Sequence, residues 1–197
     1  SCGSNESAEK PSAASSDTVA KDSSPATTAA AGSRDNTPVV LTGSADGTVT
    51  YGNDSVTVDA SHTEEGYLMV SYSGSNSKVK LQITGSDEIT YTYNLHDGYE
   101  TFPLTSGSGS YTVGVFENIE GTSYSTLFTQ AIDVTIQDEF GPYLYANQYV
   151  NFSADSKVIS KAMELSASAN DDLEVIENVY NYIITNFTYD YDKAASV

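Results

Sequence analysis

Between residues 48 and 136, apolar and polar residues alternate in short runs. A period of two places successive side chains on opposite faces, so each run predicts a strand with one buried face and one solvent-exposed face. Turn residues, mostly glycine beside aspartate, serine or asparagine, separate the runs. The expected strands cover residues 48–51, 55–58, 67–72, 79–83, 89–93, 111–116 and 131–136.

Strands at this spacing predict an antiparallel β-sandwich over residues 38–138, immunoglobulin-like or fibronectin-like in outline. The chain has one cysteine and no tryptophan, so the Cys…Trp…Cys core of antibody domains is absent. The family within this fold class and the order of the strands therefore stay open. The expected fold class is mainly β with a small α part.

After Ser153 the apolar residues recur with a helical period, which predicts one helix around residues 158–165 and a second from Asp171. Asp171 followed by Glu174 has the form of a capping box. The second helix carries a broad apolar stripe: Leu173, Ile176, Val179, Tyr180, Ile183, Ile184 and Phe187. We expect this stripe either to pack on the sandwich through residues 140–150 or to remain partly exposed.

Residues 138–153 form the expected connector between strands and helices. Pro142 excludes a central strand here, because proline cannot donate a ladder hydrogen bond. The aromatic residues of this segment predict that it packs on a neighbouring part of the chain.

Residues 1–37 are rich in Ser, Ala, Thr, Asp and Lys and contain no aromatic residue. Such a segment cannot offset its ordering entropy by burial, so a disordered tether is expected. Cys2 is the only cysteine, which excludes an internal disulfide. In a disordered tail it lacks the held base that a nucleophile needs. We expect Cys2 to be a lipidation site after removal of an export signal, with an unmodified thiol or an artefact of the expressed sequence as the alternatives.

The formal net charge of −19 makes nucleic acid an unexpected partner, because phosphate binding needs clustered Lys and Arg. No apolar run is long enough to span a membrane as a helix. The lipid on Cys2 is therefore the expected link to the membrane, and the expected location is the extracellular face of a bacterial cell membrane.

Residues 143–193, and above all the pattern from Asp171 to Asp190, resemble the opening of a transglutaminase-like domain. In that family a helix of this type ends in an Asn-x-x-Tyr-Asp segment, matched here by Asn186, Tyr189 and Asp190. The β-region, with its 116–124 hairpin, also looks like the module that precedes such domains in surface lipoproteins of Gram-positive anaerobes.

The resemblance implies a papain-like fold with a Cys-His-Asp triad that acts on peptide or amide bonds. None of the triad positions occurs in this chain, so we expect 139–197 to be a connector plus the truncated start of that domain. Asn186, Tyr189 and Asp190 are then structural residues, and the chain has no catalytic residue of its own. The alternative for Tyr189 and Asp190 is a packed aromatic beside an exposed acid.

A second hypothesis is a non-catalytic surface module that binds cell-wall carbohydrate or a protein partner. Five tyrosines suggest an aromatic platform: Tyr67, Tyr72, Tyr91, Tyr93 and Tyr99. Tyrosine is also an ordinary strand residue, and a platform usually includes tryptophan. His62 and His96 lie beside turn residues and are expected to be exposed loop histidines. No motif predicts a metal or cofactor.

Overall fold

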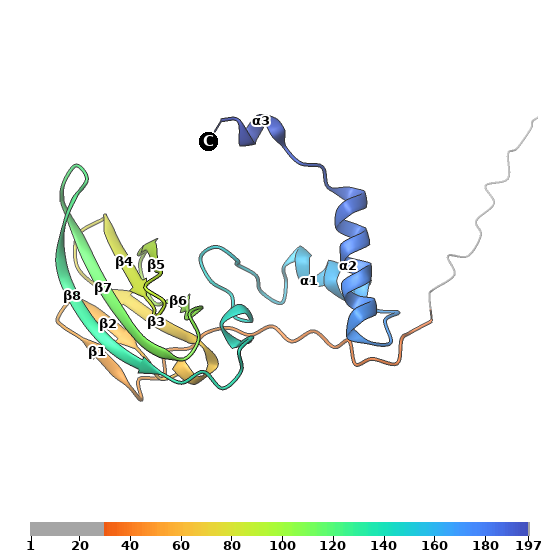
Figure 1. Cartoon of the computed structure of the whole chain (residues 1–197), viewed down its shortest axis with the longest axis horizontal. Coiled ribbons are helices and arrows are strands. Elements are labelled where there is room, and N and C mark those ends of the chain that lie inside the picture. The colour runs from red at the N-terminus through yellow and green to blue at the C-terminus, as the bar shows by residue number, and fades with distance from the viewer. Residues whose placement is uncertain (1–29, 197) are drawn as a thin grey trace, which may run out of the picture. The chain divides into compact units, whose positions relative to one another are not determined.

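The structure, a computed structural model, describes residues 30–196 and contains two antiparallel sheets followed by three helices (Figure 1). The expected tether up to residue 29, Cys2 included, lies outside the described residues. In chain order the elements are β1 (Thr50–Gly52), β2 (Val56–Asp59), η1 (Thr63–Glu65), β3 (Tyr67–Tyr72), β4 (Val79–Thr84), β5 (Thr90–Asn94), β6 (Glu100–Pro103), β7 (Gly109–Glu120), β8 (Ser123–Val134), η2 (Gly141–Tyr143), α1 (Lys157–Ser166), α2 (Asp172–Asn186) and α3 (Tyr191–Ala194).

The strands form one sheet in the order β1-β2-β3-β6 and another in the order β5-β4-β7-β8. Every named strand pairing is antiparallel. The chain changes sheet between β3 and β4, between β5 and β6, and between β6 and β7. The mainly β fold with a small α part, expected from the sequence, is confirmed.

The core lies between the two sheets and contains side chains from both. Along β4, Val79, Leu81 and Ile83 are buried while the residues between them are half-buried, so the alternation in the sequence is realised as inward and outward faces. Fully enclosed side chains come from both sheets: Val58, Leu68, Val70, Leu81, Phe102, Val113 and Val115.

Two strands differ from the sequence expectation. The sequence analysis missed β6, because a four-residue run that ends at Pro103 gives almost no alternation; the proline is tolerated because β6 is an edge strand. The last strand, β8, begins at Ser123 rather than at residue 131. Most of its first residues have side chains that carry a hydroxyl group and show no apolar pattern. They form a strand because they pair with β7.

A tyrosine hydrogen bond closes the turn between β6 and β7. The Tyr111 hydroxyl, near the start of β7, donates to the Gly107 carbonyl at 2.7 Å and accepts from the Ser106 N–H at 2.9 Å. A buried tyrosine bonded to backbone a few residues upstream at this corner is a hallmark of immunoglobulin-like sandwiches. It supports the predicted outline independently of strand counting.

The polypeptide that leaves β8 packs on the loop around η1. The Gln137 N–H donates to the Glu64 carbonyl at 2.9 Å, and the Tyr145 ring lies 4.5 Å from that of Tyr67. Gly66 has φ +91°, and a β-carbon there would lie 2.6 Å from Pro142. Glycine is therefore required at this contact by both backbone conformation and space.

Only some side chains of the connector, residues 138–153, pack on the sandwich. Tyr145 and Gln148 have partners in the sandwich, and Gln148 Nε2 donates to the Asn94 carbonyl at 2.6 Å. Phe140 and Tyr143, by contrast, are 63% and 65% exposed.

Residues 32–36, expected to belong to the disordered tether, have fixed partners beside the helices. The Gly32 N–H donates to the Ala167 carbonyl at 3.0 Å, and Arg34 Nε lies 2.6 Å from Asp172 Oδ1. Asn36 Nδ2 donates to the Ser166 carbonyl at 2.6 Å. Backbone groups at the end of α1 thus order a segment that has no apolar pattern of its own. Within residues 30–196, no helix is long and apolar enough to cross a membrane.

Candidate functional site

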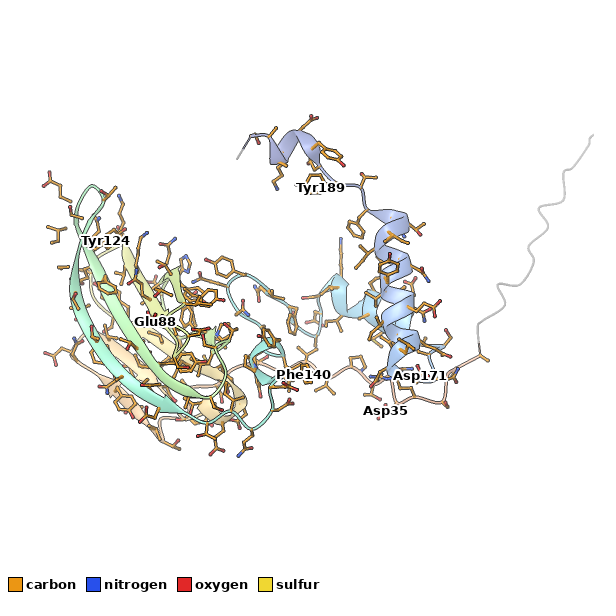
Figure 2. The ribbon with its side chains drawn as sticks, in the orientation of Figure 1. Asp35, Glu88, Tyr124, Phe140, Asp171 and Tyr189 are labelled. Carbon is orange, nitrogen blue, oxygen red and sulfur yellow. The ribbon has the colours of Figure 1, made fainter. Side chains whose placement is uncertain are left out.

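The start of α2 is fixed by side-chain caps. Asp171 Oδ1 accepts from the Glu174 N–H at 2.9 Å, as the sequence predicts. Glu174 Oε2 accepts from the Asn170 N–H at 2.7 Å, one residue before the position that an ideal capping box uses. Asp171 is labelled at this end of the helix in Figure 2. The two bonds satisfy backbone N–H groups at and just before the start of the helix.

One side of α2 packs toward α1. Asn178 Nδ2 donates to the Leu165 carbonyl at 2.9 Å, and Lys161 Nζ lies 5.0 Å from the centre of the Tyr182 ring. Val175 and Val179 are half-buried on this side. The contact is small, because only Ser166 and Ala169 are buried in the helical region.

The opposite side of α2 carries large apolar side chains in contact with solvent. We name this surface the α2 stripe; its members are Leu173, Ile176, Tyr180, Ile183, Ile184 and Phe187. They are between 49% and 71% exposed. The sequence expectation that the stripe stays partly exposed is confirmed, except that Val179 belongs to the packed side.

Two of the three motif residues, Asn186 and Asp190, stabilise the ends of helices. Asn186 Nδ2 donates to the Tyr182 carbonyl at 2.8 Å in the last turn of α2. Asp190 Oδ1 accepts from the Lys193 N–H at 2.9 Å and caps the short α3. Tyr189, labelled in Figure 2, is exposed and lies edge-on to Tyr191 with the ring centres 4.8 Å apart. The resemblance takes these three residues as structural, and that assignment stays a prediction.

His62 differs from the exposed loop histidine expected from the sequence. Its side chain is only 23% exposed, and its Nε2 lies 2.6 Å from Asp46 Oδ2. Its Nδ1 lies 3.5 Å from Glu65 Oε2, and its ring stacks on Tyr67. Partial burial alone lowers the pKa of His62, but hydrogen bonds to Asp46 and Glu65 outweigh it and raise the pKa above its ordinary value.

Ser44 Oγ lies 3.2 Å from the same Nε2 of His62, a serine–histidine contact that the sequence analysis did not identify. A general base needs a free ring nitrogen that faces the hydroxyl. Asp46 is closer to that nitrogen than Ser44 is and favours its protonated form. The cluster is therefore a hydrogen-bonded contact that joins two loops and becomes an ion pair when His62 is protonated. His96 is exposed as expected, with its Nδ1 3.0 Å from Glu100 Oε1.

The five tyrosines suggested as a platform do not share an exposed face. Tyr67, Tyr72 and Tyr93 are buried, the last in edge contact with Phe102. Only Tyr91 and Tyr99 are exposed, each by less than half. Burial of three of the five favours their reading as ordinary strand residues.

A cleft of about 620 Å³ lies at one end of the sandwich. One wall is the β6–β7 turn, and the other is the segment after β8 that includes η2. Tyr111 fixes the first wall through Gly107, and the Ile136 N–H donates to Ser108 Oγ at 2.9 Å to join the two walls. The lining residues are Leu104, Thr105, Gly107, Ser108, Ile136, Gln137, Asp138, Glu139, Pro142 and Tyr143.

The lining of this cleft combines carboxylates, hydroxyls and one exposed aromatic ring. It includes Asp138 and Glu139 but neither lysine nor arginine. Asp138 Oδ1 accepts from the N–H of Phe140, which is labelled in Figure 2. The sequence analysis missed the cleft because it assigned residues after 138 to a connector. Only folding brings that segment beside the β6–β7 turn.

No group of three or more His, Cys, Asp or Glu side chains within residues 30–196 is arranged to hold a metal ion. Comparisons with protein-family models, curated proteins and solved structures found no match to this chain. The transglutaminase-like resemblance of residues 143–193 therefore stays a prediction.

Proposed function

We propose that this chain is the N-terminal part of a cell-surface lipoprotein that resembles transglutaminase-like cysteine proteins. In this proposal Cys2 carries the lipid and residues 3–31 are the tether. The sandwich is a spacer, and α1 and α2 begin the papain-like domain. The parent protein acts on peptide or amide bonds through a Cys-His-Asp triad that these residues do not include.

The observation that carries the proposal is the α2 stripe. Burying one large apolar side chain contributes about 1.5–3 kcal/mol, and contiguous exposed apolar surface marks a site that another surface covers. We assign the cover to the rest of the same domain. The Asn186–Asp190 motif supports this assignment, because it overlaps the end of the stripe at Phe187 and resembles the family pattern at the end of such a helix.

The coding sequence downstream of the codon for Val197 tests the assignment directly. We expect a helix with a Gly-Cys pair, followed by His and Asp on strands. With the longer product in hand, amide exchange of residues 173–187 should slow markedly relative to the present chain, because buried helices open less often. Equal exchange in the two proteins would show that the added residues do not cover the stripe.

The absence of catalysis in this chain is tested with an amine-transfer assay and a peptide-cleavage assay. We expect no turnover above the rate of a buffer control. Turnover that survives the substitution Cys2→Ser would contradict the proposal, because it would require a site within the sandwich or helices.

Anchoring is tested in a bacterial host that expresses the chain behind a lipoprotein signal. Metabolic labelling with an alkyne fatty acid should mark the parent and not Cys2→Ser. Ser4→Ala is the matched control, because it leaves the thiol in place. Equal labelling of parent and Cys2→Ser would exclude Cys2 as the acceptor.

A further inference from the structure

We propose that the cleft between the β6–β7 turn and residues 136–143 binds a neutral sugar unit of a glycan. This site lies entirely within the sandwich and the segment that leaves it. It therefore does not depend on Cys2, on the α2 stripe or on the transglutaminase-like resemblance.

Hydrogen bonds fix both walls of the cleft. The Tyr111 hydroxyl holds Gly107 on one wall, and Gln137 on the other donates through its N–H to the Glu64 carbonyl and through Nε2 to Glu64 Oε2 at 2.8 Å. The Ile136–Ser108 hydrogen bond links the walls. Preformed clefts of about 300–1,000 Å³ are typical of small-ligand sites, because a fixed site avoids the entropy cost of ordering on binding.

The charges that face the cleft decide the class of ligand. Asp138 and Glu139 are present and no basic side chain lines the site, in a chain of net charge −19. A phosphate, sulfate or uronate would meet repulsion and find no cation to offset its lost hydration. Anionic ligands are therefore excluded.

The remaining groups match a pyranose ring. The exposed ring of Tyr143 offers an apolar face for the C–H side of a sugar, with a hydroxyl at its edge. Glu139 can accept hydrogen bonds from two neighbouring sugar hydroxyls, and charge-assisted hydrogen bonds of this kind are the stronger ones. Thr105 and Ser108 supply hydroxyls on the opposite wall. A lone ammonium group has donors but no acceptor, so the donor hydrogens of the Thr105 and Ser108 hydroxyls would stay without a partner.

The test titrates the isotopically labelled full chain with tetrasaccharides and follows backbone amides by NMR. The neutral probes are the N-acetylglucosamine tetramer and maltotetraose, the cationic probe is the glucosamine tetramer, and the anionic probe is tetragalacturonate. We expect saturable shifts confined to residues 104–108 and 136–143 with at least one neutral probe. Absence of such shifts with both neutral probes, or tighter binding of the cationic or anionic probe, overturns the proposal.

Three variants locate the contact. Tyr143→Ala should weaken binding about three- to tenfold through loss of the stacking surface, and Glu139→Gln should weaken it by a smaller factor. Tyr149→Ala is the matched control, because Tyr149 is also exposed but does not line the cleft. An unchanged thermal midpoint shows that each variant is folded. Equal affinity of Tyr143→Ala and the parent would overturn the assignment.

Discussion

The sandwich and the α1–α2 pair contain similar apolar residues but bury them very differently. In the sandwich, Leu68, Leu81 and Phe102 are completely enclosed between two facing sheets. In the α2 stripe, Leu173 and Phe187 are 71% and 63% exposed. Both regions follow the periodicity of their secondary structure, so periodicity alone does not decide burial. A second apolar layer must face the first.

Ile83 and Ile183 provide the sharpest form of this comparison, because one residue type occupies both environments. Ile83→Ala in β4 should lower the free energy of unfolding by about 2–5 kcal/mol, through lost burial and the cavity left behind. Urea unfolding followed by tyrosine fluorescence measures it. A loss below that range would mean that the sandwich core closes readily around a missing side chain.

Substitution of Gly66 tests how much the contact between Gly66 and Pro142 contributes to stability. Gly66→Ala should lower the free energy of unfolding by more than the about 1–3 kcal/mol expected from backbone strain alone. The residue has φ +91°, and the added β-carbon would also clash with Pro142. Gly98→Ala is the control: it has φ +80° with no atom within 4 Å of the added β-carbon, so it reports the strain alone. Thermal unfolding of both variants measures the difference. Equal losses would show that the Pro142 contact gives way without cost.

Substitution of Asp171 tests the stability of α2 separately from that of the sandwich. Asp171→Ala should destabilise α2 by about 1 kcal/mol, because the Glu174 N–H loses its acceptor. Amide exchange in the first turn of α2 should accelerate, while exchange in β4 and β7 stays unchanged. Glu177→Ala, in the second turn, should leave that first turn intact. Faster exchange in the strands would show that the two regions unfold together.

The His62 ion pairs give the sandwich a modest dependence on pH. Because the pKa of His62 is raised in the folded state, its contribution is fully present below its ordinary pKa. It is lost as the pH rises above the ordinary value of about 6.5 and through the raised value, so the parent should lose stability over that interval. Melting curves of His62→Gln should lack this loss, whereas His96→Gln should keep it. A parent profile that is flat in this range would contradict the prediction.

Ile183→Ala should have the smallest effect, within about 0.5 kcal/mol of zero, because the side chain is 49% exposed and alanine favours a helix. The measurement is the same urea unfolding used for Ile83→Ala. If the proposed domain partner covers the stripe, the same substitution should destabilise the longer protein clearly. A loss comparable with that of Ile83→Ala in the present chain would mean that the stripe is already buried in solution.

The local elements could largely be predicted from the sequence. Alternation located most strands, the change to a helical period located α1 and α2, and Asp171 was identified as the cap that it is. The sequence missed β6, which is a short edge strand, and the first part of β8, which is rich in Ser and Thr. Both are defined by their hydrogen-bonded neighbours rather than by an apolar pattern.

The candidate sites depended far more on the tertiary structure. The polypeptide sequence determined that this protein has a strand-rich region, an acidic surface and a helix with one strongly apolar side. Packing decided that Tyr67 and Tyr93 are core residues, that His62 lies between two acids, and that residues 136–143 face the β6–β7 turn. Periodicity is local and repeats within a few residues, whereas most of these contacts join segments far apart in the chain; the His62–Glu65 contact is the exception. Those groups come together only when the two sheets pack face to face and when the segment after β8 packs on the loop around η1.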